Sequence, residues 1–164
     1  MASLVQKYFE MARKGRWPKG FQHWSLADED DWTVAHEAAA YGRLPEGFNQ
    51  WSLSDKDGRT VAHIAAFWGH LPAHFTRWDL ADHRGWTVAH EAARSECLPE
   101  DFEHWDWADE EGVTVAHVAA AHGHLPQGFN QWDLADKEGR TVAQVVHEVA
   151  RLGLGDLPKG FDQW

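Results

Sequence analysis

A tetrapeptide that recurs at a constant interval constrains this chain more than any other feature. Thr-Val-Ala-His begins at Thr33, Thr60, Thr87 and Thr114, and a fifth copy, Thr-Val-Ala-Gln, begins at Thr141, always 27 residues after the previous start. Similarity at a fixed period of about 20–50 residues indicates stacked repeats, none of which can bury its apolar face alone. We therefore expect a solenoid.

The period extends well beyond the tetrapeptide. Every copy closes on a segment like residues 44–51, Leu-Pro-Glu-Gly-Phe-Asn-Gln-Trp, and all six prolines of the chain lie in such segments. Six of the eleven tryptophans share the closing position, namely Trp24, Trp51, Trp78, Trp105, Trp132 and Trp164. We expect these indoles and the phenylalanines three residues before them to form an interior seam. The positions of these closing tryptophans predict one domain over residues 1–164, with repeat units 1–24, 25–51, 52–78, 79–105, 106–132 and 133–164.

Local signals predict the elements of each unit. Residues 4–12 have the apolar spacing of an amphipathic first helix. Thr33 can cap a helix over residues 34–41, and Gly42 can end that helix in the left-handed conformation. Pro45 suits the first position of a short second helix. In the last unit, an insertion of apolar residues is expected to lengthen the terminal helix.

Residues 55–71 follow the pattern D-x-x-G-x-T-V-A-H-x-A-A-x-x-G-H-L, which begins with a tight Asp-x-x-Gly turn. The pattern resembles the first half of an ankyrin repeat, D-x-x-G-x-T-P-L-H-x-A-A-x-x-G-H-L, and the resemblance covers nearly the whole chain. It implies a hairpin-like turn and two antiparallel helices per unit, stacked into a curved protein-binding array. The period of 27 residues is shorter than the family's roughly 33, with the loss in the second helix. The predicted fold class is all-α, an α-solenoid of short ankyrin-like helix-turn-helix repeats with terminal capping units.

Composition narrows the function classes. The formal net charge is −11, yet residues 1–24 are locally basic, which we interpret as the charged outer face of a terminal repeat. The single cysteine, Cys97, excludes a disulfide framework and favours a reducing compartment. No apolar run reaches the roughly 18 residues of a membrane span and no signal peptide is evident. We expect a cytoplasmic protein with no membrane partner.

Twelve histidines raise the hypothesis of metal binding. Four of them recur in the tetrapeptide, at His36, His63, His90 and His117. Packed helices lie about 8–10 Å apart, whereas zinc ligands lie about 2.0–2.1 Å from one ion, so these four cannot share a metal. The resemblance implies a structural hydrogen-bonding role for them. His122 with His124, and His70 with His74, remain weaker metal-binding alternatives.

No nucleophile motif or phosphate-binding loop is present, and the acids near the tetrapeptide recur with the repeat instead of marking one unique site. We therefore expect no enzyme and no cofactor. Function is sought where the units differ, just before the tetrapeptide and at the end of the first helix, positions that the resemblance places along a concave groove. Trp, Tyr and Arg dominate interface energetics. We predict partner-binding residues biased toward the N-terminal half: Trp32, Tyr41, Arg59, Phe67, Trp68, Trp86 and Arg94.

The favoured function is a non-catalytic, monomeric module that binds another protein and does not contact nucleic acid directly. One alternative is that some of the predicted residues only pack against a neighbouring unit. A rival function is an acidic nucleic-acid mimic that inhibits a DNA- or RNA-binding protein. Duplex DNA presents one charge per roughly 1.7 Å, so a mimic needs dense acidic rows, and basic residues interrupt the acidic turn tips at Lys56, Arg84 and Lys137.

Overall fold

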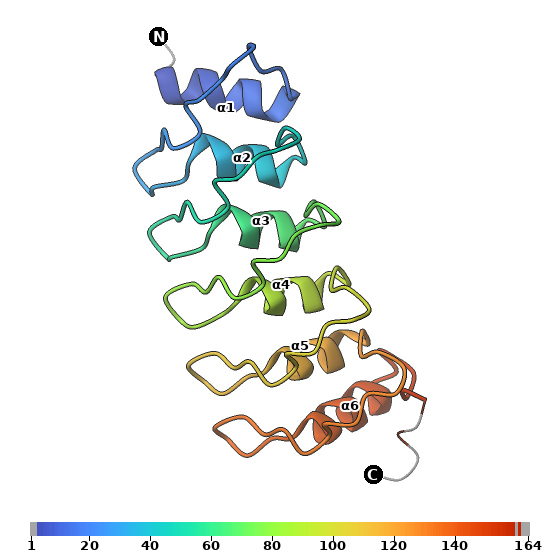
Figure 1. The fold of residues 1–164 in the computed structure, drawn as a ribbon. Helices are drawn as coiled ribbons and strands as arrows, with labels where there is room; N and C mark the ends of the chain where they lie inside the picture. The colour runs from blue at the N-terminus through green and yellow to red at the C-terminus, as the bar shows by residue number, and fades with distance from the viewer. Residues whose placement is uncertain (1–2, 160, 162–164) are drawn as a thin grey trace. The chain divides into compact units, whose positions relative to one another are not determined.

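The computed structural model describes residues 3–159 and 161, and the regular secondary structure within them is helical. The chain is therefore all-α, apart from isolated two-residue bridges. The helices are α1 (Leu4–Lys14), α2 (Val34–Ala40), α3 (Val61–Phe67), α4 (Val88–Arg94), α5 (Val115–His122) and α6 (Val142–Arg151) (Figure 1). The chain divides into two compact units, Met1–His83 and Arg84–Trp164, which we call the first and the second unit. Whether these units form one domain stays a prediction.

A reciprocal cap begins each helix that follows the tetrapeptide. The Thr33 hydroxyl accepts a hydrogen bond from the His36 N–H (3.2 Å), and the His36 ring accepts one from the Thr33 N–H (3.1 Å). α3, α4 and α5 begin in the same way, and in α6 Gln144 takes the place of the histidine. The cap predicted at Thr33 is confirmed. Helices of seven or eight residues are unstable alone, so these caps and packing must hold them.

The prediction of a second helix in each repeat is wrong for the residues that the structure describes. After α2 the chain makes a β-turn, in which the Phe48 N–H donates to the Pro45 carbonyl (3.1 Å) and Gly47 has φ +79°. Positive φ at the third turn position is the geometry of a type II turn, and it does not continue into a helix. The segment is also too short to nucleate one. As far as the described residues extend, each repeat therefore contains one helix, not the helix pair that the family resemblance implied.

The tight turn predicted at Asp55 is confirmed. The Asp55 carboxylate accepts from the N–H groups of Asp57 (3.0 Å) and Arg59 (2.9 Å), and Gly58 has φ +79°. Backbone bonds join successive turns within each unit: the Lys56 N–H donates to the Asp30 carbonyl (3.1 Å) in the first unit, and the Lys137 N–H to the Glu111 carbonyl (3.0 Å) in the second. The turns therefore form a hydrogen-bonded series at the 27-residue period.

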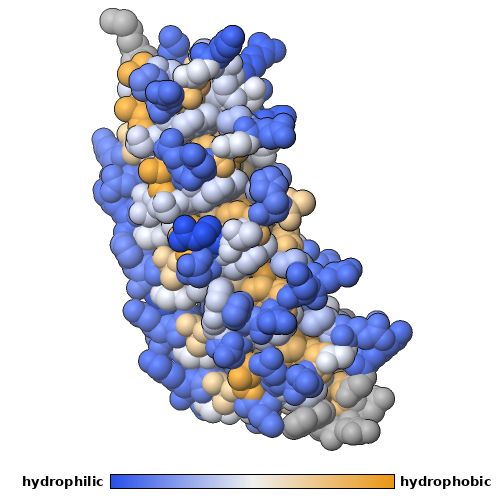
Figure 2. Space-filling model, viewed as in Figure 1, coloured by the Kyte–Doolittle hydropathy of each residue, from blue (hydrophilic) through white to orange (hydrophobic). Residues whose placement is uncertain are grey.

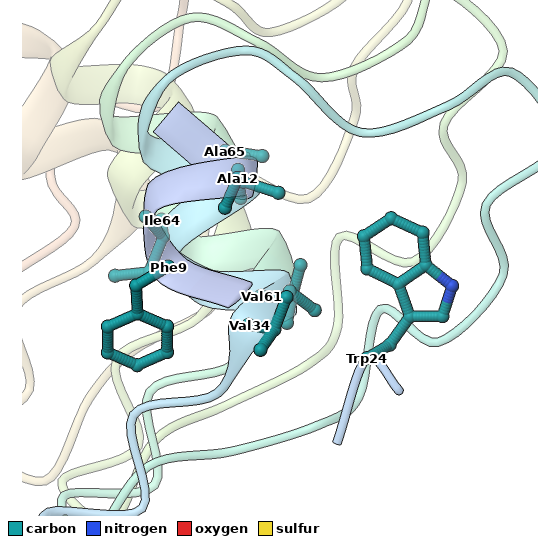
Figure 3. Close-up of a cluster of buried hydrophobic side chains, with 10 residues drawn as sticks. Phe9, Ala12, Trp24, Val34, Val61, Ile64 and Ala65 are labelled. Carbon is teal, nitrogen blue, oxygen red and sulfur yellow. The ribbon is translucent and has the colours of Figure 1, made fainter. Parts of the chain in front are cut away.

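The core of each unit lies between neighbouring helices. In the first unit α2 packs against both α1 and α3, and in the second unit α5 packs against both α4 and α6. Figure 3 shows the first core, in which Val34, Val61 and Ala65 are fully buried beside Phe9 and Trp24. Alanines on the helices are equally buried, and their small size allows the helices to approach closely.

The predicted aromatic seam is found within each unit. Trp24, Phe48, Trp51 and Phe75 follow one another with ring centroids 5.1–5.4 Å apart and edge-to-face geometry. In the second unit the series runs through Phe102, Trp105, Phe129, Trp132 and Phe161. Trp164 lies outside the described residues.

The terminal helices differ from the others as the sequence indicates. α1 has 11 residues and α6 has 10, and in α6 Val142, Val145 and Val146 are buried. The lengthening predicted for the last helix is therefore confirmed. No helix within residues 3–159 and 161 combines the length and the apolar character that crossing a membrane requires.

Replacing Trp132 by alanine tests the aromatic seam. Trp132 is 2% exposed and lies between the rings of Phe129 and Phe161, so Trp132→Ala should lower the free energy of unfolding by about 3–5 kcal/mol. Urea denaturation measures this loss. Trp68→Ala is the matched control, because Trp68 is 57% exposed and should change the midpoint little. Equal shifts for the two variants would contradict the seam.

Glu96 provides a second test, since it has φ +57° where other repeats have glycine after the helix. For a residue other than glycine, the left-handed conformation costs roughly 1–2 kcal/mol of conformational free energy. Glu96→Gly should therefore raise the free energy of unfolding by about 1 kcal/mol, measured by thermal or urea unfolding. Ser95→Gly, at the ordinary φ of −98°, is the control and should not stabilise the protein. A loss of stability in Glu96→Gly would show that the Glu96 side chain makes a compensating contact.

Candidate binding surfaces

Three of the predicted binding residues form an exposed aromatic patch in the first unit. Tyr41 is 51% exposed, Phe67 is 39% exposed and Trp68 is 57% exposed. Tyr41 and Trp68 are the C-caps of α2 and α3, two helices that pack against each other. Phe67 and Trp68 contact edge to face at 5.1 Å. We call Tyr41, Phe67 and Trp68 the aromatic patch.

Trp32, in contrast, is partly a packing residue. Its ring lies over the buried His36 ring at 5.0 Å, and its indole N–H donates to the Glu37 carboxylate (3.0 Å). The other Glu37 oxygen binds Arg13 of α1 at 2.5 Å. Trp32 thus belongs to a contact that joins α1 to α2. The alternative that some predicted residues pack within the fold applies here.

Trp32 and Arg59 do come together, at a hollow of about 510 Å³ between two turns of the first unit. The Arg59 guanidinium is held there by Asp55 at 2.8 Å and Asp57 at 3.6 Å. Its charge is therefore compensated within the protein. Arg59 is poorly suited to attract an acidic segment of a partner protein.

A larger hollow of about 1060 Å³ lies on the other side of Trp32, beside α1. Its carboxylates belong to α1, α2 and the first turn: Glu10, Asp28, Glu29, Asp30 and Glu37. Arg13 is the cation that lines this hollow, and it is paired with Glu37. The first unit therefore presents an acidic hollow in addition to its aromatic patch.

Trp86 and Arg94 belong to the second unit, where both line a groove of about 430 Å³. Trp86 lies over the His90 ring at 4.7 Å, as Trp32 does over His36. The remaining walls of the groove are mostly aliphatic, from Val113, Val118, Ala121, Val145, Val149 and Leu152. We call this the second-unit groove. Figure 2 shows one face of the molecule, on which apolar patches interrupt the hydrophilic side chains.

Sequence reasoning did not assign these aliphatic residues to a binding surface. Val145, Val149 and Leu152 are spaced by four and then three residues along α6, which places them on one helix face. That spacing was attributed to the lengthened terminal helix alone. The degree of exposure was the missing information: Val145 is buried, whereas Leu152 is 57% exposed, so the stripe extends beyond what the core covers.

The tetrapeptide histidines are structural in the bonds they make. The His36 Nδ1 accepts from the Thr33 N–H, so the proton of the neutral ring resides on Nε2, which donates to the Arg59 carbonyl (3.0 Å). His90 and His117 donate in the same way to the carbonyls of Val113 and Arg140. Each ring thus uses both nitrogens, one within its own repeat and one toward the next.

Two of the other histidines also bond to the backbone. His70 and His124 bond through Nδ1 to the carbonyls of Ala39 and Ala93, each in the helix of the previous repeat, at 2.9 Å. Among the residues that the structure describes, no three His, Cys, Asp or Glu side chains gather as metal ligands would. Burial raises the pKa of the Cys97 thiol, which keeps it in the less reactive neutral form.

No protein-family model and no curated protein matches this chain.

Acidification tests the bonding of the buried His36 ring. Burial lowers the pKa of His36 below its ordinary value of about 6.5. The contribution of the neutral His36 ring to the free energy of unfolding is therefore complete above about pH 6.5. It is lost as the pH falls, because His36 then takes up a proton more readily in the unfolded chain than in the folded protein. We expect the urea midpoint to be lower at pH 5.5 than at pH 7.5.

The chain supplies the control variant for this measurement. Gln144 occupies the equivalent position in α6 and still accepts from the Thr141 N–H (2.8 Å). His36→Gln should therefore keep the helix cap while removing one titrating ring. Its midpoint should fall less between pH 7.5 and pH 5.5 than that of the unaltered protein. An identical fall would mean that His36 does not carry the pH dependence.

Proposed function

We propose that this protein is a non-catalytic module that binds another protein, built on an ankyrin-like solenoid of short repeats. The observation that carries the proposal is the aromatic patch. Large aromatic side chains contribute much of the binding energy at interfaces and lose little conformational entropy when bound. Three of them are exposed on neighbouring helices of the first unit, at positions where the core does not need them.

Hydrogen bonds at the repeat period support the fold part of this proposal. Within each unit the turns are joined by backbone bonds, and His36, His90 and His117 bond to carbonyls 23 residues later. Such contacts between sequential neighbours are what a stacked array requires. The repeat differs from the ankyrin pattern in replacing the second helix by a β-turn and an aromatic pair.

The bonding of the histidines supports a function without catalysis. A general base needs a nitrogen available to the reacting group. His36, His90 and His117 are buried, and each uses both ring nitrogens on backbone or threonine groups. These residues contribute to the fold, which leaves binding as the use of the variable surface.

The acidic hollow of the first unit favours a second candidate, the nucleic-acid mimic that binds a basic protein. Five carboxylates line it against the single paired cation, Arg13. The acidic row does not continue along the unit, however. Lys56 of the next turn bonds to the Glu29 carbonyl and lies 3.6 Å from the Asp30 carboxylate, and Arg59 compensates Asp55. We therefore rank the mimic below the general protein-binding module.

Removing the aromatic patch tests the proposed function. The double variant Tyr41→Ala, Trp68→Ala should keep the unfolding midpoint nearly unchanged, because both side chains are more than half exposed. Its affinity for a partner captured from the native source should fall by about 2 kcal/mol or more, as loss of aromatic interface anchors does. Isothermal titration with the purified partner measures the change.

Tyr8→Ala is the control, since Tyr8 is a half-buried aromatic of the same unit that packs on Phe21 and His23. It should lower the unfolding midpoint and leave the affinity nearly unchanged. A double variant that binds its partner as tightly as the unaltered protein would overturn the proposal that the patch is the binding site.

A further inference from the structure

Two histidines at the end of α5 differ from the tetrapeptide histidines in the nitrogen that their hydrogen bonds leave available. The Nδ1 of His122 lies 2.9 Å from the Val118 carbonyl oxygen, and the Nδ1 of His124 lies 2.9 Å from the Ala93 carbonyl oxygen. A carbonyl oxygen can only accept a hydrogen bond, so in each neutral ring the proton resides on Nδ1 and Nε2 carries a lone pair. The His36 ring has the opposite arrangement, because its Nε2 donates to the next repeat.

This hydrogen bonding is the kind that metal-binding histidines use. A histidine that ligates a metal through one ring nitrogen almost always donates the proton of its other nitrogen to a carboxylate, a backbone carbonyl or water. That bond fixes both the tautomer and the direction of the ring. Neutral imidazole nitrogen is in turn a preferred ligand of Zn²⁺. His122 and His124 are therefore both in the tautomer that a zinc ion requires.

The two rings lie close enough to share one ion after a small side-chain movement. Their centroids are 6.1 Å apart and their planes are inclined by 29°. Zn–N bonds of about 2.0–2.1 Å at a tetrahedral angle place two imidazole centroids about 5 Å apart, so the rings must approach by about 1 Å. His122 is exposed and is the last residue of α5, which leaves its side chain room for that movement.

Glu96 supplies a carboxylate beside this pair. Its Oε2 lies 3.9 Å from the His124 Nε2, and its side chain is 79% exposed. Two ligand atoms on one zinc ion lie about 3.3 Å apart, so a short rotation brings this carboxylate to an ion that His124 binds. The described residues hold no set of three ligands already in place, so the histidine pair is the preformed part of the site.

The repeat pattern is broken at these same residues. Glu96 has φ +57°, whereas the equivalent residues of the neighbouring repeats are Gly69 and Gly123. Residues other than glycine persist in the left-handed conformation chiefly where the surrounding structure or a function requires their side chain. His122 and His124 form the one His-x-His sequence of the chain. Two departures from the repeat therefore meet at one place on the second unit.

We propose that His122, His124 and Glu96 bind a zinc ion, through the Nε2 atoms of the two histidines and the carboxylate of the glutamate, with water completing the coordination. Glu96 follows α4 and His122 ends α5, and these two helices pack against each other. The ion thus links two neighbouring repeats of the second unit. This site is independent of the proposed partner-binding function, which uses residues of the first unit.

Zinc titration of the full-length protein tests the site. Isothermal titration with ZnCl₂ at pH 7.5 should show one tightly bound ion per chain, and EDTA should remove it. His122→Gln and His124→Gln should each weaken the affinity by about tenfold or more, since even the loss of a residue that supports a ligand costs roughly 10–100-fold. His74→Gln is the matched control, because His74 is an exposed histidine of the first unit, and it should leave the affinity unchanged.

Unfolding measurements give a second readout that does not depend on the titration. Zinc should raise the urea midpoint of the unaltered protein, because a ligand that binds the folded state stabilises it. Glu96→Gly should raise the midpoint in the absence of zinc, since it relieves the left-handed backbone, but it should reduce the further rise that zinc produces. His122→Gln, at an exposed position, should keep the midpoint without zinc and lose most of that further rise.

Three results would overturn the proposal. They are equal zinc affinity in the unaltered protein and in both variants of the histidine pair, an equal loss of affinity in His74→Gln, and a stoichiometry of one ion per two chains. The last result would place the ion between two copies of the chain. Each of them leaves the aromatic-patch measurement standing, because that experiment uses the native partner and residues of the first unit.

Discussion

The fold depends on a histidine that bonds through both ring nitrogens. Through Nδ1 the His36 ring accepts from the N–H of Thr33, which completes the helix cap, and through Nε2 it donates to the carbonyl of Arg59 in the next repeat. A seven-residue helix cannot nucleate itself, and an isolated repeat cannot bury its apolar face. The His36 side chain stabilises the start of its own helix and also holds the neighbouring turn in position. In α6 Gln144 supplies only the cap in the bonds observed.

Features whose cause is local could be predicted from the sequence. Thr33 caps α2, Asp55 bonds to the backbone of its own turn, and Asp31 takes the left-handed conformation with φ +58° in place of glycine. Each of these depends on a few neighbouring residues, so spacing and residue type suffice. The aromatic seam could also be predicted, because the period places equivalent Phe and Trp residues next to one another when neighbouring repeats of one unit pack together.

Features that depend on competition between interactions could not be predicted. Pro45 is compatible with a helix start and with a β-turn, and the turn is formed because Phe48 must point its ring between Trp24 and Trp51. Trp32 is a packing residue because the Glu37 carboxylate binds both its indole N–H and Arg13. Spacing along the sequence does not indicate this contact. The second-unit groove combines residues from α4, α5 and α6, and which of their side chains remain exposed is decided by packing between repeats.

The residue before each threonine explains how a strict repeat can carry variable surfaces. The backbone of Arg59 is held on both sides: its N–H donates to the Asp55 carboxylate, and its carbonyl accepts from the Asp55 N–H and from His36. Val113 and Arg140 are held by the same set of bonds. Because these bonds involve only main-chain groups at that position, the side chain does not affect them. Trp, Arg and Val can therefore occupy this position in different repeats while the backbone of the turn stays the same.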